Sequence, residues 1–144
     1  MSINYFFASS DFDAKGFKNS ASSFINYFDK PKEFYNCSIA IKSIYCENTE
    51  KIKDKLRPII ICSNLTEYIE INNTQMPILK VIYPKENWTK TLNQEFDNLE
   101  YYNVNVPFSQ VIKVDLLDKN FITFDIIDGK IWLTLAVEGV KFPG

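Results

Sequence analysis

The sequence predicts an all-β protein, an antiparallel β-sandwich or barrel of about eight strands with at most one short helix. Two observations support this prediction. Apolar and polar residues alternate with a period of two over several short runs, which is typical of half-buried strands. Turn-forming residues separate these runs at short intervals, as they do in sandwiches and barrels. We therefore expect a β-sandwich or barrel rather than a helical or mixed fold.

Length and composition are compatible with one domain. The chain has 144 residues, of which 46% are hydrophobic and 24% are charged. A chain of this size buries a real core, and this composition is too apolar for disorder. Its four glycines are scattered, so no glycine-rich nucleotide-binding loop can form. We expect a single domain over residues 1–144.

The first half of the chain contains four predicted strands. In one of them Cys37, Ile39 and Ile41 fall on one face, which is the alternation of a half-buried strand. Another is a short apolar run that follows a proline, as in a buried strand, and the charged stretch Lys51–Lys55 before it is expected to be a loop. The four strands are expected at Asn4–Ala8, Ser23–Phe28, Cys37–Tyr45 and Pro58–Cys62.

The second half contains four more predicted strands. In one of them Ile112, Val114 and Leu116 alternate with charged residues and should point inward. Another begins with Pro77, a position that a strand tolerates because the missing N–H lies at its start. These strands are expected at Met76–Tyr83, Val111–Leu117, Phe121–Ile127 and Lys130–Val137.

Two turns are predicted near the end of the chain. Asp118–Asn120 should form a turn, with Asn120 tolerating a left-handed backbone conformation. Asp128–Gly129 lies between apolar runs, and Asp-Gly is a strong signal for a two-residue hairpin. Together these turns predict that the C-terminal third is an antiparallel meander.

One segment has the spacing of a short helix. Leu92, Phe96 and Leu99 recur at intervals of four and three residues, which places them on one helical face. We therefore predict a helix at Asn93–Leu99, the single helix in the chain.

The side-chain inventory excludes several kinds of chemistry. The chain has no histidine, so triads that use histidine and histidine-ligated metal sites cannot form. Its three cysteines, Cys37, Cys46 and Cys62, are odd in number and lack a C-x-x-C spacing. We expect three reduced thiols, mostly buried, with no metal, no cofactor and no catalytic residue.

Charge and hydropathy argue against two classes of partner. The net charge is −2, so there is no basic surplus to neutralise nucleic-acid phosphates. No apolar run approaches the roughly 20 residues of a membrane-spanning helix. The N-terminus, MSINYFFA, lacks the basic start and length of a signal peptide. We expect a protein made in the cytosol that binds neither nucleic acid nor membrane.

Two groups of acidic residues could in principle form sites. Asp11 and Asp13 lack the further oxygen ligands of a calcium loop, so a solvated loop is the better interpretation. Glu95, Asp97 and Glu100 contain the carboxylates that a glycosidase needs, but their spacing does not predict a catalytic pair across a cleft.

The aromatic residues are the stronger candidates. Trp132 lies in an apolar run and is expected in the core, whereas Trp88 lies among turn residues and could anchor a partner. The residues that we expect on an interaction surface are Tyr35, Trp88, Tyr101, Tyr102 and Phe142.

The order of these patterns resembles a known family. Phe6–Ser10, Asn19–Ser20, Phe24–Pro31 and Cys37–Ile44 follow one another as a strand, a turn, a strand ending near a proline, and an amphipathic strand. RPIIICSNLTE and MPILKVIYP follow as paired strands. The C-terminal pattern comprises Tyr101 or Tyr102, Val106, Ile112, Val114, Phe124, Gly129, Thr134 and Leu135. This series resembles the jelly-roll capsid proteins of virophages, Maverick (polinton) elements and adintoviruses.

The resemblance implies that the fold is a single jelly roll or a closely related antiparallel β-sandwich, and that the protein is a viral structural protein, either a penton-like or a minor capsid subunit. It also implies other capsid proteins as partners, a homo-oligomer that is a pentamer in the penton case, and a place in the virion after synthesis in the host cytoplasm. A lectin-like or host-interaction module remains the alternative, and it would need a shallow pocket combining Trp88 with Asp or Asn side chains. A carboxylate-based hydrolase is a third hypothesis, and it would need two carboxylates that face each other in a deep cleft. We expect no enzyme activity.

Overall fold

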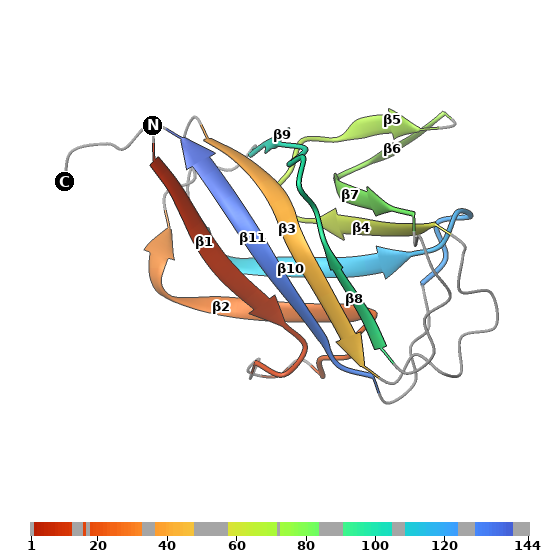
Figure 1. The fold of residues 1–144 in the computed structure, drawn as a ribbon, viewed down its shortest axis with the longest axis horizontal. Helices are drawn as coiled ribbons and strands as arrows, with labels where there is room; N and C mark the ends of the chain where they lie inside the picture. The colour runs from red at the N-terminus through yellow and green to blue at the C-terminus, as the bar shows by residue number, and fades with distance from the viewer. Residues whose placement is uncertain are drawn as a thin grey trace.

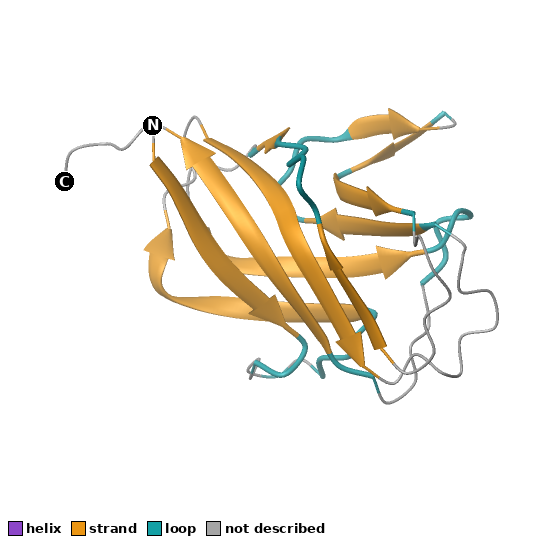
Figure 2. Cartoon of the chain, viewed as in Figure 1, coloured by secondary structure: helices purple, strands orange, loops and turns teal. Residues whose placement is uncertain are grey.

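A computed structural model describes most of the chain, namely residues 2–12, 16, 18–32, 37–47, 58–71, 73–83, 91–104, 109–123 and 129–139. These residues form eleven strands, and no helix occurs among them (Figure 2). No element in these ranges has the length and apolar character of a membrane-spanning helix. The predicted all-β class is confirmed.

Eight longer strands form two antiparallel sheets, one in front of the other in Figure 1. Sheet A has the order β1 (Ser2–Ser9), β11 (Ile131–Gly139), β3 (Cys37–Glu47), β8 (Thr91–Glu95). Sheet B has the order β2 (Ser23–Lys32), β10 (Ser109–Leu117), β4 (Ile59–Ser63), β7 (Ile78–Ile82).

The strand order is that of a jelly roll. Counted in chain order, the eight strands run 1-8-3-6 in sheet A and 2-7-4-5 in sheet B, so consecutive strands mostly alternate between the sheets. Three short strands are additions to this frame. β5 (Ile69–Ile71) and β6 (Thr74–Met76) form a hairpin, and β9 (Tyr102–Asn103) pairs with β3.

The main core lies between the two sheets. Every one of the eight longer strands contributes apolar side chains to it, because one face of each strand points inward. On β10 the inward residues are Ile112, Val114 and Leu116, as their alternation predicted. Phe24 of β2 is fully buried opposite sheet A.

A β-bulge in β3 changes which residues face the core. Ile41 pairs with Leu135 and Ser43 with Thr134, so Lys42 is an extra residue without its own partner. Before the bulge the inward residues are odd-numbered, as predicted, and after it they are even-numbered, beginning with Ile44.

The strand β4 is buried on both faces, as its continuous apolar run predicted. Ile59 and Ile61 point into the main core, while Ile60 and Cys62 form a second cluster with Ile78 on the outer face of sheet B. The hairpin of β5 and β6 supplies further apolar residues to this second cluster, namely Ile69, Ile71 and Met76. The hairpin therefore shields an apolar outer face that would otherwise contact water.

One predicted strand is divided in two. The segment Met76–Tyr83 was expected to be continuous, but the structure breaks it at Pro77, between β6 and β7. Proline has no N–H to donate to a ladder. The break lets β6 leave sheet B and pair with β5 instead.

The predicted helix at Asn93–Leu99 is wrong. Thr91–Glu95 forms β8, which pairs with β3 in the register Cys46↔Leu92. Leu92 enters the core from this strand, and Phe96 packs against the core from the segment that follows it. The helical spacing therefore arose from a strand residue and a loop residue that reach the same core separately.

The predicted C-terminal meander is also wrong. β10 lies in sheet B between β2 and β4, whereas β11 lies in sheet A between β1 and β3. The chain therefore crosses from one sheet to the other after β10. The predicted strand Phe121–Ile127 and the predicted hairpin turn Asp128–Gly129 both include residues from the range 124–128. This range lies outside the described residues.

The predicted turn after β10 is present in a modified form. The carboxylate Oδ1 of Asp118 accepts hydrogen bonds from the backbone N–H groups of Asn120 and Ile122. The left-handed residue is Phe121, with a φ of 62°, and not Asn120. Phe121 contacts the second apolar cluster, which stabilises this unfavourable backbone conformation.

A buried polar network joins β1, β2 and β11. The side chain of Asn26 accepts a hydrogen bond from the Ser9 N–H at 2.8 Å and donates one to the Ser9 carbonyl at 2.9 Å. The Ser9 hydroxyl donates to the Ile131 carbonyl at 2.8 Å. These bonds satisfy polar groups where β1 ends, so they fix the position of sheet A relative to sheet B.

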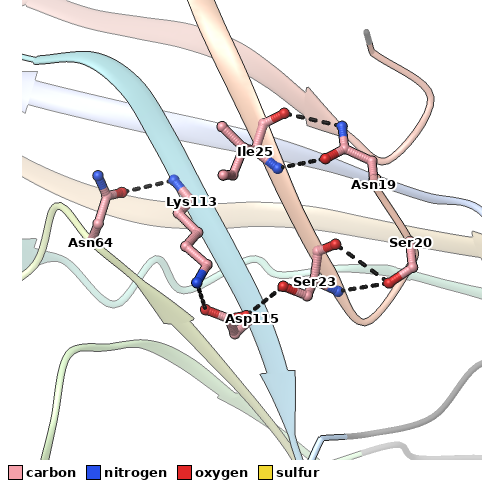
Figure 3. A network of polar contacts seen from close by, with 7 residues as sticks. All are labelled: Asn19, Ser20, Ser23, Ile25, Asn64, Lys113 and Asp115. Carbon is pink, nitrogen blue, oxygen red and sulfur yellow. Dashed lines mark hydrogen bonds and ion pairs between the residues drawn. The ribbon is translucent and has the colours of Figure 1, made fainter. Parts of the chain in front are cut away.

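A second polar network lies on the more exposed side of sheet B (Figure 3). Asn19 binds the backbone of Ile25 through both atoms of its amide, and the Ser23 hydroxyl donates to the Asp115 carboxylate at 2.7 Å. Asn64 accepts a hydrogen bond from the N–H of Lys113 on β10 at 2.8 Å. Side-chain amides thus take the place of a neighbouring strand along this part of the sheet.

Candidate interaction surface

A shallow hollow lies where a segment after β4 meets β9. The N–H of Glu67 donates to the carbonyl of Asn103 at 3.1 Å, and Thr66 bridges to Val104. Among the described residues, no further pairing joins these two segments beyond Glu67 and Asn103. The resulting hollow has a volume of about 230 Å³ and is lined by Glu67, Tyr68, Ile69, Tyr101, Tyr102 and Asn103.

The register of β9 explains how its two tyrosines are oriented. Tyr102 pairs with Ile39, an inward-facing residue of β3, and Asn103 pairs with Ser38. Because neighbouring residues of an extended chain point to opposite sides, Tyr101 faces the outer side of sheet A. Tyr101 and Tyr102 therefore border the hollow from two directions.

The electrostatic surroundings of these tyrosines are acidic. Partial burial raises the pKa of Tyr102, and the Glu100 carboxylate raises it further. Partial burial also raises the pKa of Tyr101, with added contributions from Glu138 and Tyr5. Both hydroxyls therefore stay protonated well above neutral pH and can donate hydrogen bonds.

A second feature is the exposed apolar row of β1, made of Ile3, Tyr5 and Phe7. β1 lies at the edge of sheet A, and these three side chains are 47%, 51% and 65% exposed. The strand reads SINYFFAS and contains no charged residue or proline. Natural edge strands usually carry such residues, because they prevent association with other chains.

The row of β1 and the hollow lie on the same side of the molecule. Tyr5 pairs with Ala136, which pairs in turn with Ala40. Both alanines are fully buried although they alternate with core residues, so larger side chains cover them on the outer face. The ammonium of Lys42 lies 4.8 Å from the centre of the Tyr5 ring, and the side chains of Tyr101 and Tyr5 lie near enough to interact electrostatically.

The predicted interaction residues have different placements. Tyr101 and Tyr102 border the hollow, whereas Tyr35, Trp88 and Phe142 lie outside the described residues. Sequence reasoning missed Tyr68 and the β1 row. The signal for the row was present, because both faces of residues 3–8 are rich in apolar side chains and an edge strand can bury only one of them.

The prediction that Trp132 lies in the core is wrong. Ile131 and Leu133 point inward on β11, so Trp132 points to the outer face of sheet A and is half-buried. Its ring meets that of Phe12 edge to face, with centroids 5.1 Å apart. An apolar strand buries every second residue, and Trp132 falls on the other face.

The acidic candidates are dispersed or paired. Glu95 and Asp97 are exposed, and Glu100 forms an ion pair with Lys80 at 3.1 Å. Asp11 pairs with Lys130 at 3.5 Å, and Asp13 lies outside the described residues. In the part of the chain that the structure describes, no three cysteine or acidic side chains gather as metal ligands would.

The three cysteines are free thiols, as predicted. Cys46 and Cys62 are buried and Cys37 is half-buried. Burial raises the pKa of the Cys46 thiol to about 12, and Glu47 adds to this effect. The pKa of Cys62 rises to about 11 through burial and the nearby Asp115, and burial raises that of Cys37.

We expect these thiols to react slowly with DTNB at pH 8 in the folded protein, with Cys37 reacting first, because the thiolate is the attacking form. All three should react quickly in urea. A Cys37→Ser variant should leave the native protein nearly inert, and rapid native reaction of that variant would contradict the burial of the other two thiols.

The raised pKa values of Cys46 and Cys62 also predict a dependence of stability on pH. Since unfolded thiols ionise near pH 9, the contribution of these two thiols to stability should decline as the pH rises from about 9 to about 12.

Comparison of the sequence with models of known protein families gave no match, and comparison with curated proteins gave none either.

Proposed function

We propose that this protein is a structural subunit of a viral capsid, either penton-like or minor, which acts by assembling with copies of itself and with other capsid proteins. The sequence resemblance to virophage, Maverick and adintovirus proteins motivates the proposal. The jelly-roll strand order supports it, because this architecture is common in capsid domains. One architecture serves many functions, so the surface of this protein, and not its fold, distinguishes among them.

The uncharged, apolar edge strand β1 is the observation that carries the proposal. Ile3, Tyr5 and Phe7 project from the outer face, and within the described residues β1 has a neighbouring strand only on the β11 side. A strand of this kind is an association site unless another chain covers it. In a closed assembly the neighbouring subunit provides that cover, and we expect pentamers.

Light scattering over a range of protein concentration and salt tests this proposal. We expect a discrete closed oligomer that persists as NaCl is raised, because salt screens charges and does not weaken apolar contacts. A Phe7→Glu variant should weaken assembly by about 10- to 100-fold, since it replaces the burial of one large apolar side chain by that of a charge.

Tyr83→Glu is the matched control, because Tyr83 is similarly exposed but lies just after β7, at the other sheet. This variant should assemble as the unmodified protein does, and circular dichroism should show both variants folded. A strictly monomeric protein at all concentrations, or equal assembly of the two variants, would contradict the assembly proposal.

A lectin-like binding module is the second candidate, and the hollow is the observation in its favour. Tyrosine rings can stack on sugars, while Asn103 and Glu67 offer hydrogen-bonding groups for hydroxyls. Trp88, which the sequence analysis assigned to such a pocket, lies outside the described residues. A glycan array that gives no binding would remove this candidate.

A further inference from the structure

We propose that the hollow between Glu67–Ile69 and Tyr101–Asn103 is a binding site for an organic cation, an ammonium or guanidinium group. Three of its six lining residues are tyrosines, and its one charged lining residue is Glu67. Aromatic faces attract cations through their quadrupole, and a carboxylate at the rim adds direct attraction. This proposal does not depend on the assembly of the protein.

The size of the hollow fits one cationic group. A volume of about 230 Å³ is below the roughly 300–1,000 Å³ of pockets that enclose whole drug-sized molecules. The site therefore has room for a head group such as trimethylammonium, or for the end of one arginine or lysine side chain.

The charges around the hollow favour a cation over a neutral sugar. Burial raises the pKa of Tyr102 and of Tyr101, and the carboxylates of Glu100 and Glu138, respectively, raise it further. A negative electrostatic potential has this effect on a tyrosine hydroxyl. Lys80 partly offsets Glu100, to which it is paired, but Glu67 and Glu138 have no such ion pair among the described residues. A neutral sugar would gain nothing from this potential, whereas a cation would gain directly.

The protein already places lysines over other aromatic rings. Lys42 lies over Tyr5 at 4.8 Å, and Lys80 lies over Phe96 at 4.4 Å. No lysine or arginine among the described residues lies over Tyr68, Tyr101 or Tyr102 in the same way. Tyr68 is also 66% exposed, so its ring is accessible to a cation from outside the chain.

Titration followed by two-dimensional NMR of the backbone amides tests the proposal. The probes are choline and 3,3-dimethylbutan-1-ol, which have nearly the same shape but differ in charge. We expect choline to shift the amide signals of Tyr68, Ile69 and Asn103 saturably, with binding about 10-fold tighter than that of the alcohol. N-acetyl-arginine methylamide is a third probe and a model of a protein side chain. Its affinity relative to that of choline shows whether the site prefers a guanidinium or a quaternary ammonium group.

Two variants locate the effect. Tyr68→Ala and Glu67→Gln change exposed side chains and should each weaken choline binding about fivefold, while the fold is retained. The control Tyr83→Ala removes an equally exposed tyrosine away from the hollow and should bind choline normally. Equal binding of choline and the alcohol, or no saturable shift with any of the three probes, would overturn the proposal.

Discussion

Replacing Asn26 with alanine should lower the free energy of unfolding by about 3 kcal/mol. The Asn26 amide is buried and satisfies both the N–H and the carbonyl of Ser9. Its removal leaves two buried backbone groups without partners, and each such group costs about 1–3 kcal/mol. Urea denaturation followed by circular dichroism would measure this loss.

Asn19→Ala is the matched control for this prediction. The Asn19 side chain makes two hydrogen bonds with the backbone of Ile25 (Figure 3) and donates a third to the Phe12 carbonyl, but Asn19 is only half-buried. Water can replace these bonds, so the expected loss is about 1 kcal/mol. Equal losses in the two variants would show that burial does not determine the importance of the Asn26 network.

Replacing Glu100 with glutamine should destabilise the protein by about 2 kcal/mol, whereas replacing Lys80 with methionine should have little effect. The Lys80 side chain is only 6% exposed, and its ammonium lies 3.1 Å from a Glu100 oxygen. Glutamine removes the anion and leaves the buried cation, but methionine removes the cation and keeps the apolar stem. The loss is below that of a fully buried pair, because Glu100 is 62% exposed and water can approach it.

The double variant completes this second test. Lys80→Met combined with Glu100→Gln should recover most of the stability lost with Glu100→Gln alone, because no buried charge remains. Thermal or urea unfolding of the four proteins measures the coupling. A loss for Lys80→Met as large as that for Glu100→Gln would instead indicate that the ion pair itself stabilises the fold.

The sequence patterns predicted strands well where a single face is buried. Ile112, Val114 and Leu116 alternate without interruption, and β10 follows this pattern. The pattern failed where a bulge intervenes, because Lys42 shifts the phase within β3. The continuous apolar run of β4 did indicate a buried strand, but it did not show that a hairpin covers its outer face.

Strand pairing was not predictable from local signals. Turn residues after β10 suggested that consecutive strands would pair, but β11 pairs with β1 and β3 from the first third of the chain. The turn chemistry of Asp118 was nevertheless recognised, because an Asp side chain binds nearby backbone N–H groups wherever the chain goes next. The wrong prediction of a helix at Asn93–Leu99 has the same cause. The spacing of apolar residues there is a local signal, whereas β8 is formed by pairing with β3, which is distant in the sequence.

The hollow was predictable in part. Tyr101 and Tyr102 were candidates because exposed aromatic residues are the expected anchors of an interaction surface. Their partner Tyr68 comes from the segment between β4 and β5, and the pairing of Thr66 with Val104 and of Glu67 with Asn103 brings it close. A single sequence carries no signal for a contact of this kind.

The position of β11 in sheet A has a consequence for the order of folding. β11 is the last of the described strands, yet it lies between β1 and β3, and the bond between Ser9 and Ile131 spans 122 residues. On the ribosome, β1 and β3 must wait until β11 has been synthesised before sheet A can close. Because contacts between distant residues form slowly, the apolar faces of these waiting strands are the surfaces most open to aggregation during that interval.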